Sequence, residues 1–165
     1  MIATLTRSPT DVARTAAMLA AALLAVLAVA LVIGSATLRD TWWPTAPRDT
    51  ATGGLGEAAS LTLHNLVALG WPLALRALGW RRWDVTRHVA AVAIAAMAAV
   101  HLVVAGTAIV AWPSILGLLT HGPFELVALA CVIDGWRATD PRPHTAAFAV
   151  AILLGAIVEA NVAPW

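Results

Sequence analysis

Charge is scarce in this chain, and its scarcity excludes several classes of protein. Charged residues make up 12% of the 165 residues, the basic ones are all arginine, and the formal net charge is only +1. A strongly basic surface of the kind that binds nucleic acid is absent, so no nucleic-acid partner is expected. The single cysteine, Cys131, lies in an apolar run and cannot form a disulfide within the chain. We expect it to be a small buried hydrophobic residue.

The sequence also lacks the short motifs that hold common cofactors. It contains no phosphate-binding loop, dinucleotide fingerprint, nucleophilic serine elbow or paired-cysteine motif. No cofactor is therefore expected. The HExxH zinc motif is absent as well, although the histidines and glutamates described below are numerous enough for a zinc site of another kind.

Long hydrophobic stretches dominate what is present. Hydrophobic residues make up 61% of the chain, and the mean hydropathy is +0.84. The sequence predicts an all-α, polytopic integral membrane bundle in one domain, residues 16–165, after a cytoplasmic tail of residues 1–15. A signal peptide is the competing interpretation of the first segment, but its apolar core would be too long and Gly34-Ser35-Ala36 is a poor cleavage site. The five expected transmembrane segments are residues 16–38, 58–78, 89–112, 124–136 and 145–163.

The arginines orient these segments. If the N-terminus is cytoplasmic, only Arg39 and Arg48 fall outside, which is the positive-inside pattern of a multi-pass protein of the cell membrane. Tryptophans gather where the segments meet water, as in an interfacial aromatic belt. The outer connection at residues 113–122 carries no charge and is expected to be an interfacial or re-entrant piece. The inner arginines are Arg7, Arg14, Arg76, Arg81, Arg82, Arg87, Arg137 and Arg142.

Five ionisable side chains lie within the hydrophobic segments or at their edges. An acid or base at the centre of a bilayer costs on the order of 2.5–3.5 kcal/mol, so a chain that keeps several of them is expected to use them. In the oriented bundle all five fall in the outer half of the membrane, where they can line one cavity. Asn65 and Asn161 accompany them as supporting polar residues. The candidate catalytic residues are His64, His101, His121, Glu125 and Glu159.

Glu125 also has a structural interpretation. It follows Gly122 and Pro123, so Pro123 is expected to be the first helical residue and Glu125 the third. A carboxylate at that position can accept hydrogen bonds from the free amides of the first turn and favours the positive end of the helix dipole. The His121-to-Glu125 spacing does not suggest a metal site, because the helix start is expected to separate the two orientations.

The four other candidates also have structural alternatives, and the alternative is weakest for His101. His121 can be an interfacial loop residue, Glu159 can reach water near the end of its helix, and His64 can form hydrogen bonds between helices. His101 lies far from both ends of its segment, where loop, cap and snorkelling explanations fail. A neutral imidazole bonded to a neighbouring helix is the structural alternative for His101, and a functional role is preferred.

The two remaining histidines are expected to be unremarkable surface residues. His88 and His144 lie beside arginines on the cytoplasmic side of the oriented bundle. Both side chains are therefore expected to be solvated.

Three short stretches resemble one known family. They are Thr62-Leu63-His64-Asn65-Leu66, His121-Gly122-Pro123-Phe124-Glu125-Leu126 and Ala156-Ile157-Val158-Glu159-Ala160-Asn161-Val162-Ala163-Pro164. In order and spacing they resemble the stage II sporulation protein M family of polytopic membrane proteins. The resemblance covers about residues 58–165, and its central stretch is the most specific of the three.

The resemblance implies a helical membrane protein with one of two kinds of role. In sporulating bacteria, family members anchor peptidoglycan-degrading enzymes during engulfment. Related proteins accompany genes for ribosomally made bacteriocin peptides, where a role in maturation, export or immunity is inferred. By matching motifs, His121, Glu125 and Glu159 would be the polar residues of the family.

The chain departs from the family pattern at three places. His64 stands where an asparagine is usual, and His101 matches no family position. The basic stretch 81–88 replaces a typically glycine-rich region. These departures argue against a plain scaffold, because both histidines are added on helices that lead to the same depth.

The sequence therefore favours acid/base chemistry inside the membrane. Histidine titrates near neutrality and, with a carboxylate, can exchange protons with a substrate. The predicted substrate is a hydrophobic peptide, and the predicted reaction is proton transfer at Cα, as in epimerisation or elimination during maturation of a ribosomally made peptide. His101 and His64 are the expected acid/base groups, with Glu125 or His121 as their partner.

Other functions stay open at this point. The first is a non-catalytic membrane anchor, immunity factor or export accessory, as the resemblance implies, and it needs no histidine within the membrane. A zinc site and a proton-coupled transporter are less favoured.

A bundle of five short segments encloses little volume, so a second membrane subunit or a homo-oligomer is an expected partner, besides the lipid bilayer and the peptide.

Overall fold

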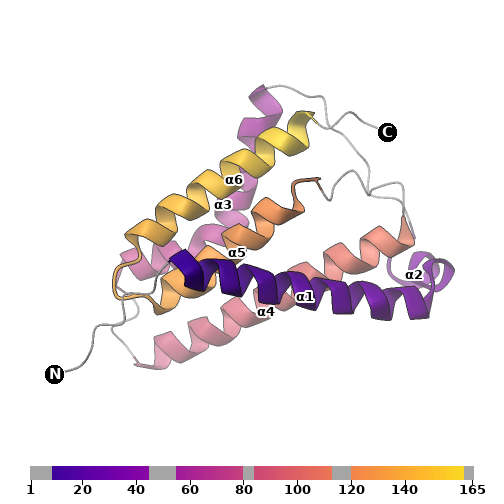
Figure 1. The fold of residues 1–165 in the computed structure, drawn as a ribbon, viewed down its shortest axis with the longest axis horizontal. Coiled ribbons are helices and arrows are strands. Elements are labelled where there is room, and N and C mark those ends of the chain that lie inside the picture. Colours follow the sequence, from indigo (N-terminus) through magenta and orange to yellow (C-terminus); the bar gives the residue numbers. More distant parts are fainter. Residues whose placement is uncertain (1–8, 45–54, 80–83, 113–119, 162–165) are drawn as a thin grey trace.

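The regular structure of this protein is helical. The computed structural model describes residues 9–44, 55–79, 84–112 and 120–161, and within these ranges it contains no β-strand. The prediction of an all-α helical bundle is confirmed (Figure 1). The helices of these ranges are α1 (Pro9–Ile33), α2 (Ser35–Thr41), α3 (Leu55–Ala77), α4 (Asp84–Ala111), α5 (Gly122–Arg137) and α6 (Arg142–Asn161).

Among the described residues, four helices are long and apolar enough to cross a membrane. This agrees with the predicted multi-pass membrane protein. α5, which corresponds to the expected segment 124–136, is different. Its 16 residues span about 24 Å, less than the hydrocarbon core of roughly 30 Å. The four candidate spans are Asp11–Ile33, Leu55–Ala77, Arg87–Ala111 and Arg142–Asn161.

The first expected segment, residues 16–38, is not a single helix. α1 begins at Pro9 and ends at Ile33, and Gly34 adopts a φ of 89°. Glycine takes this left-handed conformation at little cost because it has no Cβ atom. The chain then continues in the separate short helix α2, so the membrane span starts and ends earlier than the hydropathy pattern predicts.

The helices alternate in direction, and one end of the bundle collects the termini that carry arginine. Figure 1 shows the starts of α1, α4 and α6 and the ends of α3 and α5 on the same side of the molecule. Arg39, in α2, lies at the opposite end. This division has the form of the positive-inside pattern. We call the first side the arginine-rich end, and its described arginines are Arg14, Arg76, Arg87, Arg137 and Arg142.

α5 is the central helix. It packs against α1, α3, α4 and α6, and all its residues at 128–132 and 134–136 are buried. Cys131 is fully buried among them, as predicted. A helix too short to span the bilayer is thus covered by longer helices, which present most of the large exposed hydrophobic side chains. The core side chains around α5 include Leu69 and Leu73 of α3, Ile94 of α4, and Phe148 and Ile152 of α6.

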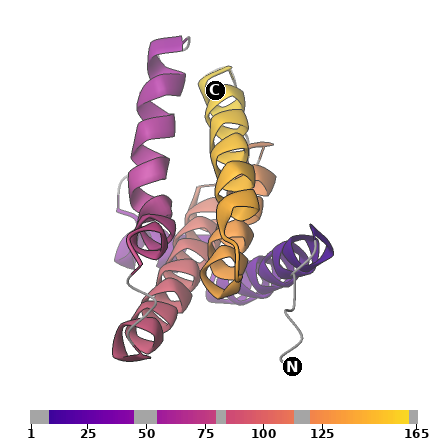
Figure 2. The same ribbon diagram turned by 90° about the vertical axis from the view of Figure 1, so that its left-hand side faces the viewer.

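Glycines let α3 and α6 approach α5 closely. A Cβ atom at Gly135 would lie 2.8 Å from Cδ2 of Leu73 and 2.9 Å from Cβ of His144, and one at Gly155 would lie 3.2 Å from Cβ of Phe124. Small residues allow such close packing between membrane helices. Figure 2 shows α3 and α6 side by side above the crossing pair α1 and α4.

Two tryptophans link α2 to α4 by hydrogen bonds at the end of the bundle opposite the arginine-rich end. Nε1 of Trp43 donates a hydrogen bond to Oγ1 of Thr107 (3.2 Å), and Nε1 of Trp112 donates to the carbonyl oxygen of Trp43 (3.3 Å). The guanidinium of Arg39 lies 5.2 Å from the centroid of the Trp112 ring, a cation–π distance. These contacts fix the end of the helix that carries His101.

Parts of several predicted features lie outside the described residues. These parts are most of the first outer connection, the uncharged piece at 113–119, and the end of the third matched stretch. The first residues of the expected tail and part of the basic stretch 81–88 also belong to this group.

Candidate functional site

His101 has an ionisable partner on a neighbouring helix. It lies in the apolar part of α4, about 15 Å before the last residue of that helix. Its Nε2 atom is 3.0 Å from Oε2 of Glu125, which belongs to the first turn of α5. The side chains are 30% and 20% exposed, respectively. Polar groups that face lipid must be satisfied by protein, so this pair removes part of the cost of placing both groups in a membrane.

A second histidine shares the same carboxylate. Nε2 of His121 lies 3.8 Å from Oε1 of Glu125, within ion-pair distance but beyond a good hydrogen bond. The side chain of His121 is 11% exposed. Each histidine faces a different oxygen of Glu125, so the carboxylate lies between two imidazole rings.

The predicted start of α5 is wrong in two details. The helix begins at Gly122, so Pro123 is the second helical residue and Glu125 the fourth. The side chains of His121 and Glu125 are also not separated in orientation, because they approach each other one turn apart. Within the described residues no backbone amide donates to the Glu125 carboxylate, which is occupied by the two rings instead.

The contact with His101 shows how deep α5 begins. Because Glu125 reaches a residue well inside α4, the first turn of α5 is level with the body of α4 and not with its end. Figure 1 shows α5 starting short of the end of α4. The positive end of the α5 dipole therefore lies beside the carboxylate, where negative charge is favoured.

Both histidines direct Nε2 to the carboxylate, which leaves Nδ1 as the free nitrogen. In the part of the chain that the structure describes, Nδ1 of neither ring has a hydrogen-bond partner, and Nδ1 of His121 is buried. A hydrogen bond from Nε2–H to a carboxylate sets the tautomer that carries its lone pair on Nδ1. The partly exposed ring of His101 can then accept a proton at Nδ1, while Glu125 stabilises the imidazolium.

His64 does not join this group. It lies on an exposed face of α3, next to Leu63 at 64% exposure and close to Val67 at 67%. No hydrogen bond or ion pair among the described residues links it to His101, His121 or Glu125. Asn65, which was expected to support the site, is partly buried on the same helix.

Glu159 lies on the side of α6 that approaches the start of α5. It is one turn beyond Gly155, which packs against Phe124, the residue before Glu125. Glu159 is partly buried. Asn161 is exposed and donates from Nδ2 to the carbonyl oxygen of Ile157 at 2.7 Å, so its side chain satisfies its own helix.

A second set of buried polar side chains lies near the arginine-rich end. Asp134 is 1% exposed and His144 is 6% exposed, so the expectation that His144 is solvated is wrong. Sequence position could not reveal this burial, because His144 is covered by the close approach of α6 to Gly135. Nη2 of Arg76 donates to the carbonyl oxygens of Ala138 and Thr139 (2.9 and 3.2 Å), which satisfies carbonyl groups just after α5 ends.

The described side chains do not support the zinc alternative. Across the described ranges, no group of three or more His, Cys, Asp or Glu side chains could hold a metal ion. His101 and His121 instead direct one nitrogen each to a shared carboxylate. This arrangement suits the sharing of a proton more than the coordination of a cation.

No protein-family model, curated protein or solved structure matches the chain.

Proposed function

We propose that this protein is a membrane-embedded, cofactor-independent acid/base enzyme that transfers a proton at a Cα atom of a hydrophobic peptide. The observation that carries the proposal is the Glu125 carboxylate between the rings of His101 and His121. An ionisable triad placed in an apolar bundle is costly, and a function in proton transfer gives a reason for keeping it.

His101 is the proposed base. Its Nδ1 atom takes the Cα proton while its Nε2–H stays on Glu125, and the electron pair of the C–H bond moves into the adjacent carbonyl group as an enolate. If a leaving group departs from Cβ, the enolate collapses to a dehydro residue and the departing group takes up a proton. His121 faces the same carboxylate at 3.8 Å, so the passage of a proton between the two rings through Glu125 requires this distance to shorten to a hydrogen bond.

Epimerisation needs a second acid on the opposite face of Cα. The triad supplies bases around one carboxylate, so the second group has to come from another helix. We propose Glu159 on α6 as this second acid, because its face of the helix approaches the start of α5. His64 on α3 is the alternative second acid, and its participation would require α3 to approach α4.

A hydrophobic substrate fits the surroundings of the triad. Val100 and Val104 flank His101 and are 62% and 47% exposed, and Val127, which is close to Glu125, is 37% exposed. The partly exposed ring of His101 thus lies in an apolar outer surface of the bundle. A peptide segment within the bilayer can reach this ring from the side.

A second candidate function is favoured by a different observation. Of the helices that pack on α5, α4 has the smallest contact with it, and the His101–Glu125 hydrogen bond is a specific polar link between the two, beside apolar core residues such as Ile94 and Val132. A purely structural bond of this kind suits an anchor, immunity factor or export accessory, as the resemblance to stage II sporulation protein M proteins implies.

Two substitutions at one position separate these functions. In His101→Gln, the side-chain amide can replace the Nε2–H donor to Glu125 but cannot accept a proton, whereas His101→Leu removes both properties. Native membranes are prepared in deuterated water, and co-purifying peptides are analysed by mass spectrometry for deuterium at Cα. His88→Leu, on an exposed inner part of the same helix, is the matched control.

If the protein is an enzyme, we expect a labelled peptide with the wild type and with His88→Leu, and none with either variant of His101. If the protein is an anchor, we expect no labelled peptide with any variant. We then also expect a cell-wall hydrolase or transporter subunit to co-purify with the wild type and with His101→Gln. That second pattern would overturn the catalytic proposal.

A further inference from the structure

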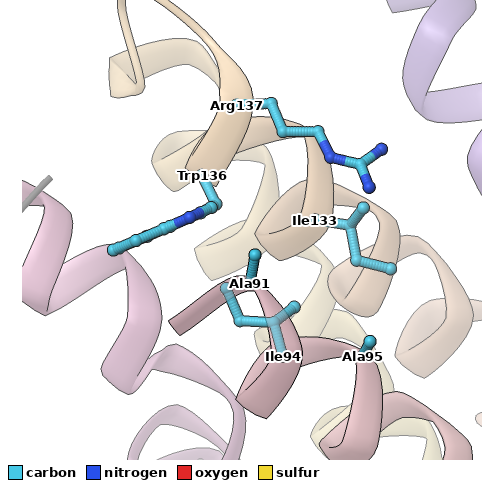
Figure 3. Close-up of a pocket in the computed structure, with 6 residues that line it drawn as sticks. All are labelled: Ala91, Ile94, Ala95, Ile133, Trp136 and Arg137. Atoms are coloured by element: carbon cyan, nitrogen blue, oxygen red, sulfur yellow. The ribbon is translucent and has the colours of Figure 1, made fainter. Parts of the chain in front are cut away.

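A cavity lies between α4 and α5 near the arginine-rich end, away from the triad. Its volume is about 90 Å³, and its walls come from three residues of each helix. Figure 3 shows the α4 side chains facing those of α5 across this space. The lining residues are Ala91, Ile94 and Ala95 of α4 and Ile133, Trp136 and Arg137 of α5.

The α4 wall is a shallow furrow that runs into the membrane. Ala91 and Ala95 are one turn apart and exposed, whereas Ile94 is 3% exposed and forms the floor. Ala91 lies one turn after Arg87, so the cavity begins about 6 Å from that arginine along the helix axis. The furrow therefore leads from the charged end of α4 into its apolar part.

The α5 wall adds a cation and an aromatic ring. The side chain of Arg137 is exposed, and no described residue forms a hydrogen bond or ion pair with its guanidinium. Figure 3 shows the guanidinium of Arg137 beside Ile133, and the ring of Trp136 at the opposite side of the cavity. The ring of Trp136 is buried and forms an apolar wall, whereas an exposed arginine at the end of a membrane helix is typical of headgroup level. The cavity thus has an apolar interior and, at its mouth, a cation that has no partner among the described residues.

We propose that this cavity binds one anionic phospholipid, with its phosphate on Arg137 and the upper part of an acyl chain in the furrow of Ala91 and Ala95. Charge complementarity selects this occupant. In the predicted orientation the arginine-rich end faces the cytoplasmic leaflet, which carries anionic lipids, and basic pockets between membrane helices on that side bind lipid headgroups. A second protein helix would cover the furrow but would leave the Arg137 guanidinium without an anion.

Native mass spectrometry of the full chain tests the site. The protein is released from nanodiscs that contain equal amounts of phosphatidylglycerol and phosphatidylcholine, and the retained lipids are counted. Arg137→Gln removes the cation, and Ala95→Leu fills the furrow. Arg142→Gln is the matched control, because Arg142 is exposed at the same end of the bundle but does not line the cavity.

The wild type should retain phosphatidylglycerol in preference to phosphatidylcholine. Arg137→Gln should reduce that preference about fivefold, as expected for one basic side chain near an anionic headgroup. Ala95→Leu should reduce the retention of both lipids, and Arg142→Gln should change the preference by less than about twofold. The melting temperature of each variant in the same nanodiscs checks that it is folded.

Four results would overturn the proposal. Equal retention of the two lipids by the wild type would show that the cation does not select the headgroup. Equal effects of Arg137→Gln and Arg142→Gln would indicate only a diffuse basic surface. A dimer that is lost with Ala95→Leu would identify a second copy of the chain as the occupant. Displacement of the lipid by millimolar inorganic phosphate would point to an anion site without chain recognition, against this assignment.

Discussion

The Nε2 atom of His101 lies 3.0 Å from Oε2 of Glu125, and this contact joins the body of α4 to the first turn of α5. α5 is too short to cross a bilayer, and the contact places its first turn level with the body of α4. The contact therefore gives an ionisable partner to two groups that lipid would not stabilise. The proposed chemistry and the structural alternative both depend on it.

Glu125→Gln tests whether the charge of this contact matters. The amide oxygen of glutamine can still accept a hydrogen bond from His101, but it cannot stabilise an imidazolium or carry a proton. We expect the rate of deuterium incorporation at Cα of the bound peptide to fall about 100- to 10,000-fold, as is usual when general acid–base catalysis is removed. Glu57→Gln, in the first turn of α3, is the control. A rate that survives Glu125→Gln would contradict the proposed role.

His101→Leu tests the contribution of the contact to stability. The substitution leaves Glu125 with His121 alone, at 3.8 Å. Loss of a partner for a largely buried acceptor costs on the order of 1–3 kcal/mol, so unfolding in detergent should occur at lower denaturant concentration. His64→Leu is the comparison, because His64 is exposed on α3 and lacks these contacts. It should leave the unfolding midpoint unchanged or raise it, and an equal loss in both variants would contradict the structural interpretation.

Features that depend on local composition were predictable from the sequence. Hydrophobic length and charge define helices that can cross a membrane, because each backbone amide in lipid must be satisfied within its own segment. The segment around His101 was found in this way, as was the arrangement of arginines such as Arg76 and Arg137 at one end. The sequence predicted that His101 and Glu125 lie in the outer half of the membrane, where they can line one cavity, but it did not show that they face each other.

Features that depend on packing were not predictable in the same way. The break at Gly34 requires a positive φ that hydropathy does not register. His64 and His101 were expected at the same depth, but depth does not determine the direction of a side chain around its helix, and His64 lies on an exposed face. His144 is buried because Gly135 admits α6, which is a contact between residues of two helices. Periodicity and charge within one segment contain little information about such contacts.

Gly135→Ala tests the close packing of α3 and α6 against α5. The added methyl group would lie 2.8 Å from Leu73 and 2.9 Å from His144, so these side chains would have to move. Such overpacking costs about 1–3 kcal/mol, and the melting temperature should fall. Gly56→Ala is the matched control, since a Cβ atom at that helical position has no neighbour within 4 Å. It should be neutral or stabilising, and equal melting temperatures of the two variants would show that α5 tolerates looser packing.

Trp43→Phe and Thr107→Val test the link between α2 and α4. Phenylalanine keeps an aromatic ring but lacks the Nε1–H that donates to Oγ1 of Thr107 at 3.2 Å, and valine keeps the shape of threonine without the hydroxyl group. The hydrogen bond predicts a coupling free energy of about 0.5–1.5 kcal/mol in a double-mutant cycle of unfolding. Because both substitutions preserve most of the apolar contact, packing alone predicts additive losses. A coupling near zero would therefore mean that α2 is held against α4 by ring burial, and that the hydrogen bond does not fix the end of the helix carrying His101.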